Sequence, residues 1–89
     1  MIKNNIIELV KKLCMTQGIL GMHGIYGFYS PGKRLHMIYE PVSPTIAISW
    51  DNEMVFIVYK NKISLFKEGA EWERILEDAG RKLNEEETK

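Results

Sequence analysis

The segment 45–67, TIAISWDNEMVFIVYKNKISLFK, constrains the fold more than any other part of the chain. Its three runs of β-branched and aromatic residues are separated by Asp51-Asn52 and Lys60-Asn61, residue types that suit two-residue hairpin loops. The pattern predicts an antiparallel meander of three strands. The middle run, MVFIVY, is apolar at every position, whereas a strand with one wet face alternates between apolar and polar. We therefore expect both faces of the sheet to be covered.

Two-residue loops without irregularities place opposed residues on the same face of the sheet. With that register, one face holds Ile46, Ile48, Trp50, Val55, Ile57, Tyr59 and Phe66. The other face holds Ala47, Met54, Phe56, Val58, Ile63 and Leu65. Two helices can cover only one face of a sheet this wide, so we expect a protein partner, or a second copy in a homodimer, on the face with Trp50, Tyr59 and Phe66.

Amphipathic patterns on either side of this segment predict two helices. The first covers Ile2 to Thr16, with Gly18 as a candidate left-handed C-terminal cap. The second begins at Ala70, and acidic residues in its first turn and Arg81 and Lys82 in its last turn would match the helix dipole. Its apolar stripe consists of Trp72, Ile75, Leu76, Ala79 and Leu83. Residues 84–89 are polar, and we expect them to fray.

Residues 35–40, LHMIYE, predict one further strand with Leu35, Met37 and Tyr39 on one face, ended by two nearby prolines. The expected order is helix, loop, strand, three-strand meander, helix. The fold class is α+β, with a four-stranded, mostly antiparallel sheet and the C-terminal helix packed on it. For a sequence of 89 residues we expect a single domain, 1–89, and no second one.

The segment 18–33, GILGMHGIYGFYSPGK, has a glycine at every third position from 18 to 27. Such glycine density indicates either a close backbone approach or a mobile surface loop. The candidate binding residues here are Tyr26, Phe28, Tyr29, Lys33 and Arg34. Basic residues beside aromatic rings suit a phosphate backbone with stacked bases, but the chain has 12 basic and 12 acidic residues. Nucleic acid is therefore a possible partner that we do not favour.

Cysteine and histidine usage excludes several kinds of site. The single cysteine, Cys14, makes an internal disulfide impossible, and its place on the apolar side of the first helix predicts a buried structural thiol. With no leader pattern or apolar span, we expect a cytoplasmic protein that does not enter a membrane. His23 and His36 lack paired metal-ligand spacing, so we expect no metal and no cofactor. The run GFYSPGKR is not a phosphate-binding loop, because Arg34 stands where the magnesium-binding hydroxyl would be.

Three short segments resemble the small toxin ribonucleases of the HicA type. Gly21-Met22-His23 is similar to their glycine-serine-histidine motif, and Pro31-Gly32-Lys33-Arg34 resembles their turn into a strand. Lys67-Glu68-Gly69, Ile75-Leu76 and Ala79-Gly80 are similar to their closing helix. The resemblance implies a helix–three strands–helix fold, His23 as the general acid or base of messenger RNA cleavage, and an antitoxin as partner. Met22 replaces the serine, and the hairpins within 45–66 have no counterpart in that family.

The leading hypothesis is a non-enzymatic protein-binding or inhibitory module, because the sequence offers no convergent set of nucleophile, base and orienting residue. Such a module would act through its sheet face and the glycine- and aromatic-rich loop. The alternative is an RNA-acting protein, possibly a HicA-like ribonuclease, that uses His23 with Lys33 and Arg34. Whether the protein is an enzyme stays open on the sequence alone, with the non-enzymatic interpretation preferred.

Overall fold

The computed structural model describes residues 3–87, and within them the chain is an α+β fold, as predicted. One α-helix precedes the strands in the sequence and the other follows them, and a short 3-10 helix, η1, connects the first two strands. The elements are α1 (Lys3–Gln17), β1 (Ile19–Leu20), η1 (Met22–Gly24), β2 (Tyr26–Tyr29), β3 (Leu35–Glu40), β4 (Thr45–Trp50), β5 (Glu53–Tyr59), β6 (Lys62–Phe66) and α2 (Ala70–Glu87).

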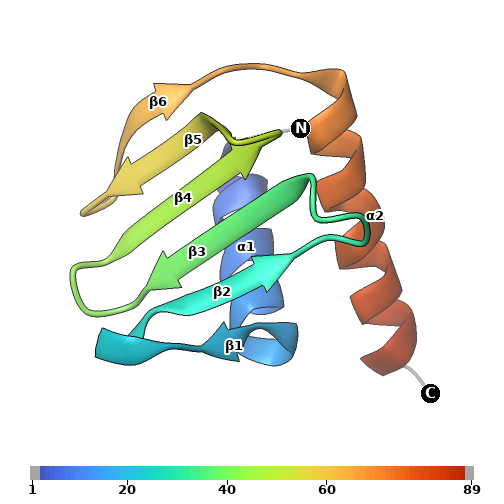
Figure 1. Cartoon of the computed structure of the whole chain (residues 1–89), viewed down its shortest axis with the longest axis horizontal. Helices are drawn as coiled ribbons and strands as arrows, with labels where there is room; N and C mark the ends of the chain where they lie inside the picture. Colours follow the sequence, from blue (N-terminus) through green and yellow to red (C-terminus); the bar gives the residue numbers. More distant parts are fainter. Residues whose placement is uncertain (1–2, 88–89) are drawn as a thin grey trace.

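The six strands of the described residues form one sheet in chain order, and each strand is antiparallel to the next. In Figure 1, α1 lies behind the sheet and α2 stands at the right-hand ends of the strands, and both helices contribute side chains to the core on one face of the sheet. The sequence predicted four strands. The two additional strands, β1 and β2, lie in the glycine-rich segment that was interpreted as a loop.

Close backbone packing explains why a glycine-rich segment forms strands here. A Cβ on Gly18 would lie 2.3 Å from the Cys14 carbonyl oxygen and 2.9 Å from the Gly27 carbonyl oxygen, so only glycine fits between α1 and β2. Gly18 does not have the left-handed conformation predicted for a cap, because its φ is not positive. The left-handed glycines are Gly24, with φ 72° in η1, and Gly32, with φ 83° in the β2–β3 turn.

The hydrophobic core lies between the sheet and the two helices. Leu35, Met37 and Tyr39 alternate with less buried neighbours along β3 and face the helices, as predicted. The other buried core residues are Ile6, Val10, Leu13 and Cys14 of α1, Ile46 and Ile48 of β4, Val55, Phe56 and Val58 of β5, and Trp72, Leu76 and Leu83 of α2. Cys14 is fully buried, as predicted, and desolvation raises the pKa of its thiol to about 12.

Both predicted hairpin loops are present, but the register between the strands is not the ideal one. Asp51, Asn52, Lys60 and Asn61 all have positive φ, which is the geometry of a type I′ turn. A β-bulge then shifts the β4–β5 register between Ile48 and Ser49, and a second shifts the β5–β6 register after Ile57. Each shift moves later residues to the opposite face, so the predicted division of the meander into two faces is wrong.

Paired positions define the two actual faces of the meander. The face toward the helices carries Ile46, Ile48, Trp50, Phe56, Val58, Ile63 and Phe66. The opposite face carries Ala47, Met54, Ile57, Tyr59 and Leu65. Within the described residues the helices cover the first of these faces alone, whereas the sequence predicted a cover for both.

The helix boundaries differ from those predicted. Ile2, the predicted start of the first helix, lies outside the described residues. α2 continues through Glu87, past the last apolar position at Leu83, so Arg81 and Lys82 are not in its last turn. Two contacts to α1 accompany this extension: Lys12 Nζ donates to Asn84 Oδ1 at 2.9 Å, and Gln17 Nε2 donates to Glu86 Oε2 at 2.9 Å. Of the predicted frayed tail, residues 88–89 lie outside the described residues.

Candidate functional site: the open sheet face

The face of the sheet that the helices leave uncovered has three rows of side chains running across the strands. The middle row joins direct cross-strand partners, one from each strand: Ile19, Gly27, Ile38, Ala47, Ile57 and Leu65. One flanking row contains Tyr29, His36, Ser49 and Met54, and the other contains Glu40, Thr45, Tyr59 and Lys62. We call these fourteen residues the open sheet face.

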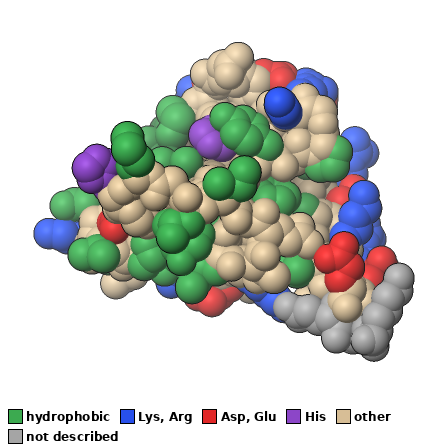
Figure 2. Space-filling view, turned by 60° about the horizontal axis from the view of Figure 1, so that its bottom comes forward, with side chains coloured by type: hydrophobic (Ala, Val, Ile, Leu, Met, Phe, Trp, Pro, Cys, Tyr) green, Lys and Arg blue, Asp and Glu red, His purple; other side chains and the backbone are tan. Residues whose placement is uncertain are grey.

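The middle row contains no polar or charged side chain, although it faces away from the core. Its end at β1 is the most exposed, with Ile19 at 80%. Tyr29 and Tyr59 in the flanking rows are 55% and 50% exposed. Figure 2 shows hydrophobic side chains gathered toward the β1–β2 edge of the molecule, while most charged side chains lie around the periphery. A continuous apolar surface of this kind typically marks a site of interaction.

Tyr29 and His36 form an aromatic pair in one flanking row. Their ring centroids are 4.2 Å apart and their planes differ by 6°, so the rings are stacked. His36 Nε2 also lies over the bare backbone of Gly27, at 3.9 Å from the place where a Cβ would be. Desolvation lowers the pKa of His36, because partial burial disfavours the charged imidazolium. The imidazole is therefore a largely neutral, flat surface beside the apolar middle row.

Charge on the open sheet face is confined to the other flanking row. Glu40 accepts hydrogen bonds from the backbone amides of Val42, at 3.0 Å, and Ser43, at 2.6 Å, and from the Ser43 hydroxyl. The hydroxyl bond is the first cause of the lowered pKa of Glu40, followed by the amide bonds. The carboxylate thus caps the β3–β4 turn, and its charge is partly satisfied within the chain.

The structure divides the predicted binding residues among three places. Tyr26 and Phe28 lie on the helix side of β2 and pack against the core. Phe66 is also on that side, edge-to-face with Phe56 and with Trp72 at centroid distances of 5.7 and 6.2 Å. Tyr29 and Tyr59 belong to the open sheet face. The expectation that Trp50, Tyr59 and Phe66 share one face is therefore wrong, because the two β-bulges shift the register between the strands.

Arg34 and Trp50 form a polar clasp at the end of the sheet nearest α2. The Arg34 guanidinium lies 4.3 Å from the Trp50 ring centroid and binds Asp51 through two hydrogen bonds, Nε–Oδ1 at 2.8 Å and Nη2–Oδ2 at 2.6 Å. Glu71 at the start of α2 lies 3.9 Å from Nη2. The hydrogen bonds from Arg34, and then its positive charge, hold the pKa of Asp51 below its usual range. Lys33, with φ 60°, is exposed beside this clasp.

Sequence reasoning missed Ile38, Ala47 and the neighbouring His36 at the centre of the open sheet face, whereas Ile57 was placed on the face expected to bind a partner. Ala47 and Ile57 were assigned to different faces because the bulge after Ile48 is invisible in an alternating pattern. The doubly apolar sequence of β5 was the available signal. It correctly indicated that the second face of the sheet carries apolar side chains.

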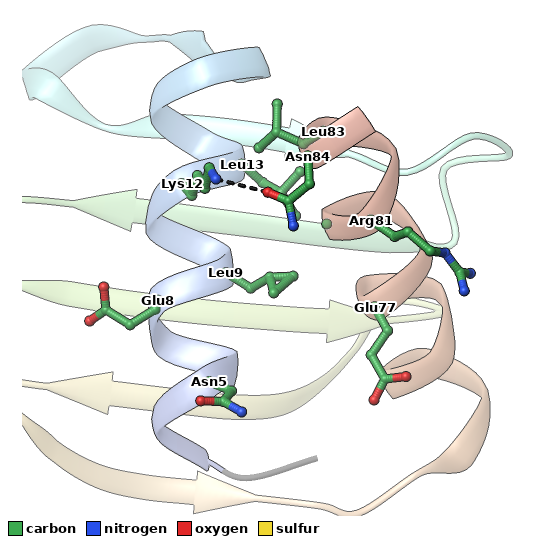
Figure 3. A pocket seen from close by; sticks show the side chains of 10 residues that line it. Asn5, Glu8, Leu9, Lys12, Leu13, Glu77, Arg81, Leu83 and Asn84 are labelled. Carbon is green, nitrogen blue, oxygen red and sulfur yellow. Dashed lines mark hydrogen bonds between the residues drawn. The ribbon is translucent and has the colours of Figure 1, made fainter. Parts of the chain in front are cut away.

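A groove between the two helices has a volume of about 500 Å³ (Figure 3). Leu9 projects from α1 toward α2, where a Cβ on Gly80 would come within 2.2 Å of its Cδ2. Leu13 and Leu83 complete the apolar floor, while Glu8 and Arg81 stand at the outer margins. The close approach of Leu9 to Gly80 serves the packing of the helices against each other.

Neither the groove nor the open sheet face assembles a recognisable catalytic group. His23 is exposed in η1 with φ 62°, and no described residue makes a hydrogen bond, ion pair or ring contact with its side chain. The part of the chain that the structure describes contains no cluster of metal-ligating side chains and no buried side-chain polar atom without a partner.

Across residues 3–87, no helix combines the length and the apolar composition needed to cross a membrane. Comparisons with models of known protein families, with curated proteins and with solved structures find no match to this chain.

Proposed function

We propose that this chain is a small non-enzymatic protein-binding module and that the open sheet face is its binding surface. The observation that carries the proposal is the apolar middle row, which crosses all six strands on the side without helices. Desolvating such a row against a partner releases about 25 cal/mol for each Å² of apolar surface buried. The charged groups stand beside the row, in the manner of a polar rim around an interface core.

Exposed aromatic side chains add to this support. Tyr29, stacked on His36, and Tyr59 present large, stiff surfaces that lose little conformational entropy on binding. A module that occupies a partner's surface in this way would bind or inhibit that partner without chemistry of its own. The glycine- and aromatic-rich segment contributes Tyr29 to this surface, together with Ile19 and Gly27 of the middle row.

The RNA-acting hypothesis has less support from the arrangement of its residues. Tyr26 and Phe28 pack toward the core, and Arg34 is engaged by Asp51 and Glu71, so they do not form a stacking platform with a free cation. RNA cleavage by the wild type and by His23→Ala tests the hypothesis. Cleavage that the substitution abolishes would establish the enzymatic reading, whereas equal or absent cleavage in both removes it.

The protein-binding proposal is tested by affinity purification with three tagged baits in the native host. Wild-type bait and the control Lys11→Gln, which changes the outer side of α1, should retain the same bound protein, including an untagged copy of the chain if that is the partner. Ile57→Lys, which places a charge in the middle row, should lose it. A bound protein that survives Ile57→Lys equally well, or no specific capture by any bait, would contradict the proposal.

A further inference from the structure

The middle row of the open sheet face alternates between small and large residues. From β2 to β5 its members are Gly27, Ile38, Ala47 and Ile57, each directly opposite the next across a pair of strands. Ala47 is only 7% exposed on a face that no helix covers, because the larger side chains beside it stand higher. Gly27 leaves a second depression, open except for His36 Nε2 at 3.9 Å from its absent Cβ. The row is a series of two ridges and two hollows.

We infer that the open sheet face binds a second copy of this chain, related by a two-fold axis that runs parallel to the strands between β3 and β4. This inference rests on the proposed function, since it names the partner of the same surface. The rotation reverses the order of the row, so Ile38 meets Ala47 of the partner subunit and Ile57 meets Gly27 of the partner subunit. The two central ridges then enter hollows, Leu65 at one end of the row meets Ile19 of the partner subunit, and the aligned sheets form a sandwich.

The flanking rows match under the same rotation. His36 faces Ser49 of the partner subunit, which pairs an imidazole with a hydroxyl. Tyr29 faces Met54 of the partner subunit, and thioether sulfur packs favourably against aromatic rings. In the charged row, Glu40 faces Thr45 of the partner subunit, so the rotation brings no carboxylate against another. Shape and polarity therefore agree on one placement of the axis.

Neighbouring placements of the axis either lose this fit or pair fewer strands. An axis between β2 and β3 would set Ile38 against Gly27 of the partner subunit and Ile19 against Ala47 of the partner subunit, but would leave β5 and β6 without a counterpart. An axis along β4 would set Ile38 against Ile57 of the partner subunit and leave Ala47 facing its own equivalent, with a clash beside a void. An axis between β4 and β5 would set Ile38 against Leu65 of the partner subunit and leave β1 and β2 without a counterpart. The middle of the six-stranded sheet is thus the placement that pairs all strands and sets large against small across the four central ones.

Complementation between two variants tests this geometry. Ile38→Ala leaves a hollow against a hollow, and Ala47→Ile sets a ridge against a ridge, each twice per homodimer. We expect either variant alone to raise the dimer dissociation constant about 10- to 100-fold in sedimentation equilibrium. An equimolar mixture should form a heterodimer with an affinity within about threefold of the wild type, because the new hollow and the new ridge then meet. Substitutions that act only within one chain cannot restore affinity in a mixture.

Gly27→Val gives a second variant that is independent of this pair. The position has a negative φ, and apart from the adjacent residues no atom of the chain lies closer than 3.9 Å to an added Cβ. The dimer should weaken, because Ile57 of the partner subunit needs that hollow. Circular dichroism and thermal unfolding confirm folding of each variant.

The outcomes separate this inference from the proposed function. A wild-type chain that stays monomeric at millimolar concentration overturns the two-fold pairing. So does an equimolar mixture of Ile38→Ala and Ala47→Ile whose dissociation constant is no lower than that of the weaker of the two homodimers. If Ile57→Lys nevertheless releases a different captured protein, the open sheet face remains a binding surface and only self-association fails. If no open-face substitution changes either measurement, both fail.

Discussion

Replacing Gly69 with alanine tests how tightly the start of α2 is locked to the sheet. A Cβ at this position would lie 2.5 Å from Cδ1 and 2.7 Å from Nε1 of Trp72. The indole has little freedom to retreat, because it is 2% exposed, packs edge-to-face on Phe66 and donates from Nε1 to the Lys67 carbonyl at 3.0 Å. The added methyl group must therefore displace the ring, the backbone or both.

The expected loss of stability in Gly69→Ala follows from two destabilising contributions and one stabilising contribution. Forcing extra volume into a packed site costs about 1–3 kcal/mol, and weakening the indole hydrogen bond costs about 1 kcal/mol more. Alanine returns about 0.4–1 kcal/mol by restricting the unfolded chain. The net loss is about 2 kcal/mol of unfolding free energy, which lowers Tm by about 8–16 °C for a domain of this size.

Urea and thermal unfolding of Gly69→Ala beside Gly21→Ala measure this loss. Gly21 is the matched control, because its φ is −96° and the nearest atom to an added Cβ is the Ile25 carbonyl oxygen at 3.5 Å, so alanine should be neutral or slightly stabilising. In a Trp72→Phe background the smaller ring should reduce the cost of Gly69→Ala by about 1 kcal/mol. Equal stability of the two alanine variants, or an unchanged cost in that background, would refute the packing argument.

Three further expectations concern titratable groups. The Cys14 thiol, buried and with its pKa raised to about 12, should resist thiol reagents at neutral pH until urea unfolds the chain; rapid reaction of the native protein would contradict this. The pKa of Glu40 is lowered, so its contribution to stability is present above the unfolded-state pKa and is lost as pH falls through the folded-state value. Ser43→Ala should raise the pKa of Glu40 in an NMR titration and make the unfolding free energy fall less steeply at acid pH. An unchanged pKa would exclude the Ser43 hydroxyl as the main cause of the lowered value. His36 also has a lowered pKa, so stability should rise with pH across the window between its folded value and about 6.5, and His36→Gln should remove that rise if desolvation causes it.

Local patterns predicted the elements that depend on local chemistry. The alternation in β3 gave its buried face, the loops at Asp51-Asn52 and Lys60-Asn61 gave the meander, and the apolar stripe beginning at Trp72 gave α2. These features follow from residue type and spacing within one element. No knowledge of the rest of the chain is needed to find them.

The features that sequence reasoning missed depend on contacts between distant segments. Gly18 and Gly27 lie where the backbone at the end of α1 approaches β2 closely. In the sequence alone, the same glycines are typical of a flexible loop. The bulge after Ile48 adds one residue to β5, and this single residue turns Ile57 and Tyr59 from the helix side to the open side. The candidate surface was thus expected on the correct segment, but several of the residues assigned to it lie on the helix side of the sheet.

Methyl-resolved NMR of isotopically labelled wild-type protein, recorded from millimolar concentration down to the low micromolar range, bears on the open sheet face as a binding surface. We expect concentration-dependent shifts for the methyl groups of Ile38, Ala47 and Ile57, because these residues lie in the middle row of the open sheet face. The methyl groups of Ile46 and Leu76, buried between sheet and helices, should stay constant. Shifts confined to Leu9 and Leu83, in the groove between the helices, would contradict the open sheet face as the binding surface. So would methyl signals of Ile38, Ala47 and Ile57 that change neither with protein concentration nor on addition of the captured partner.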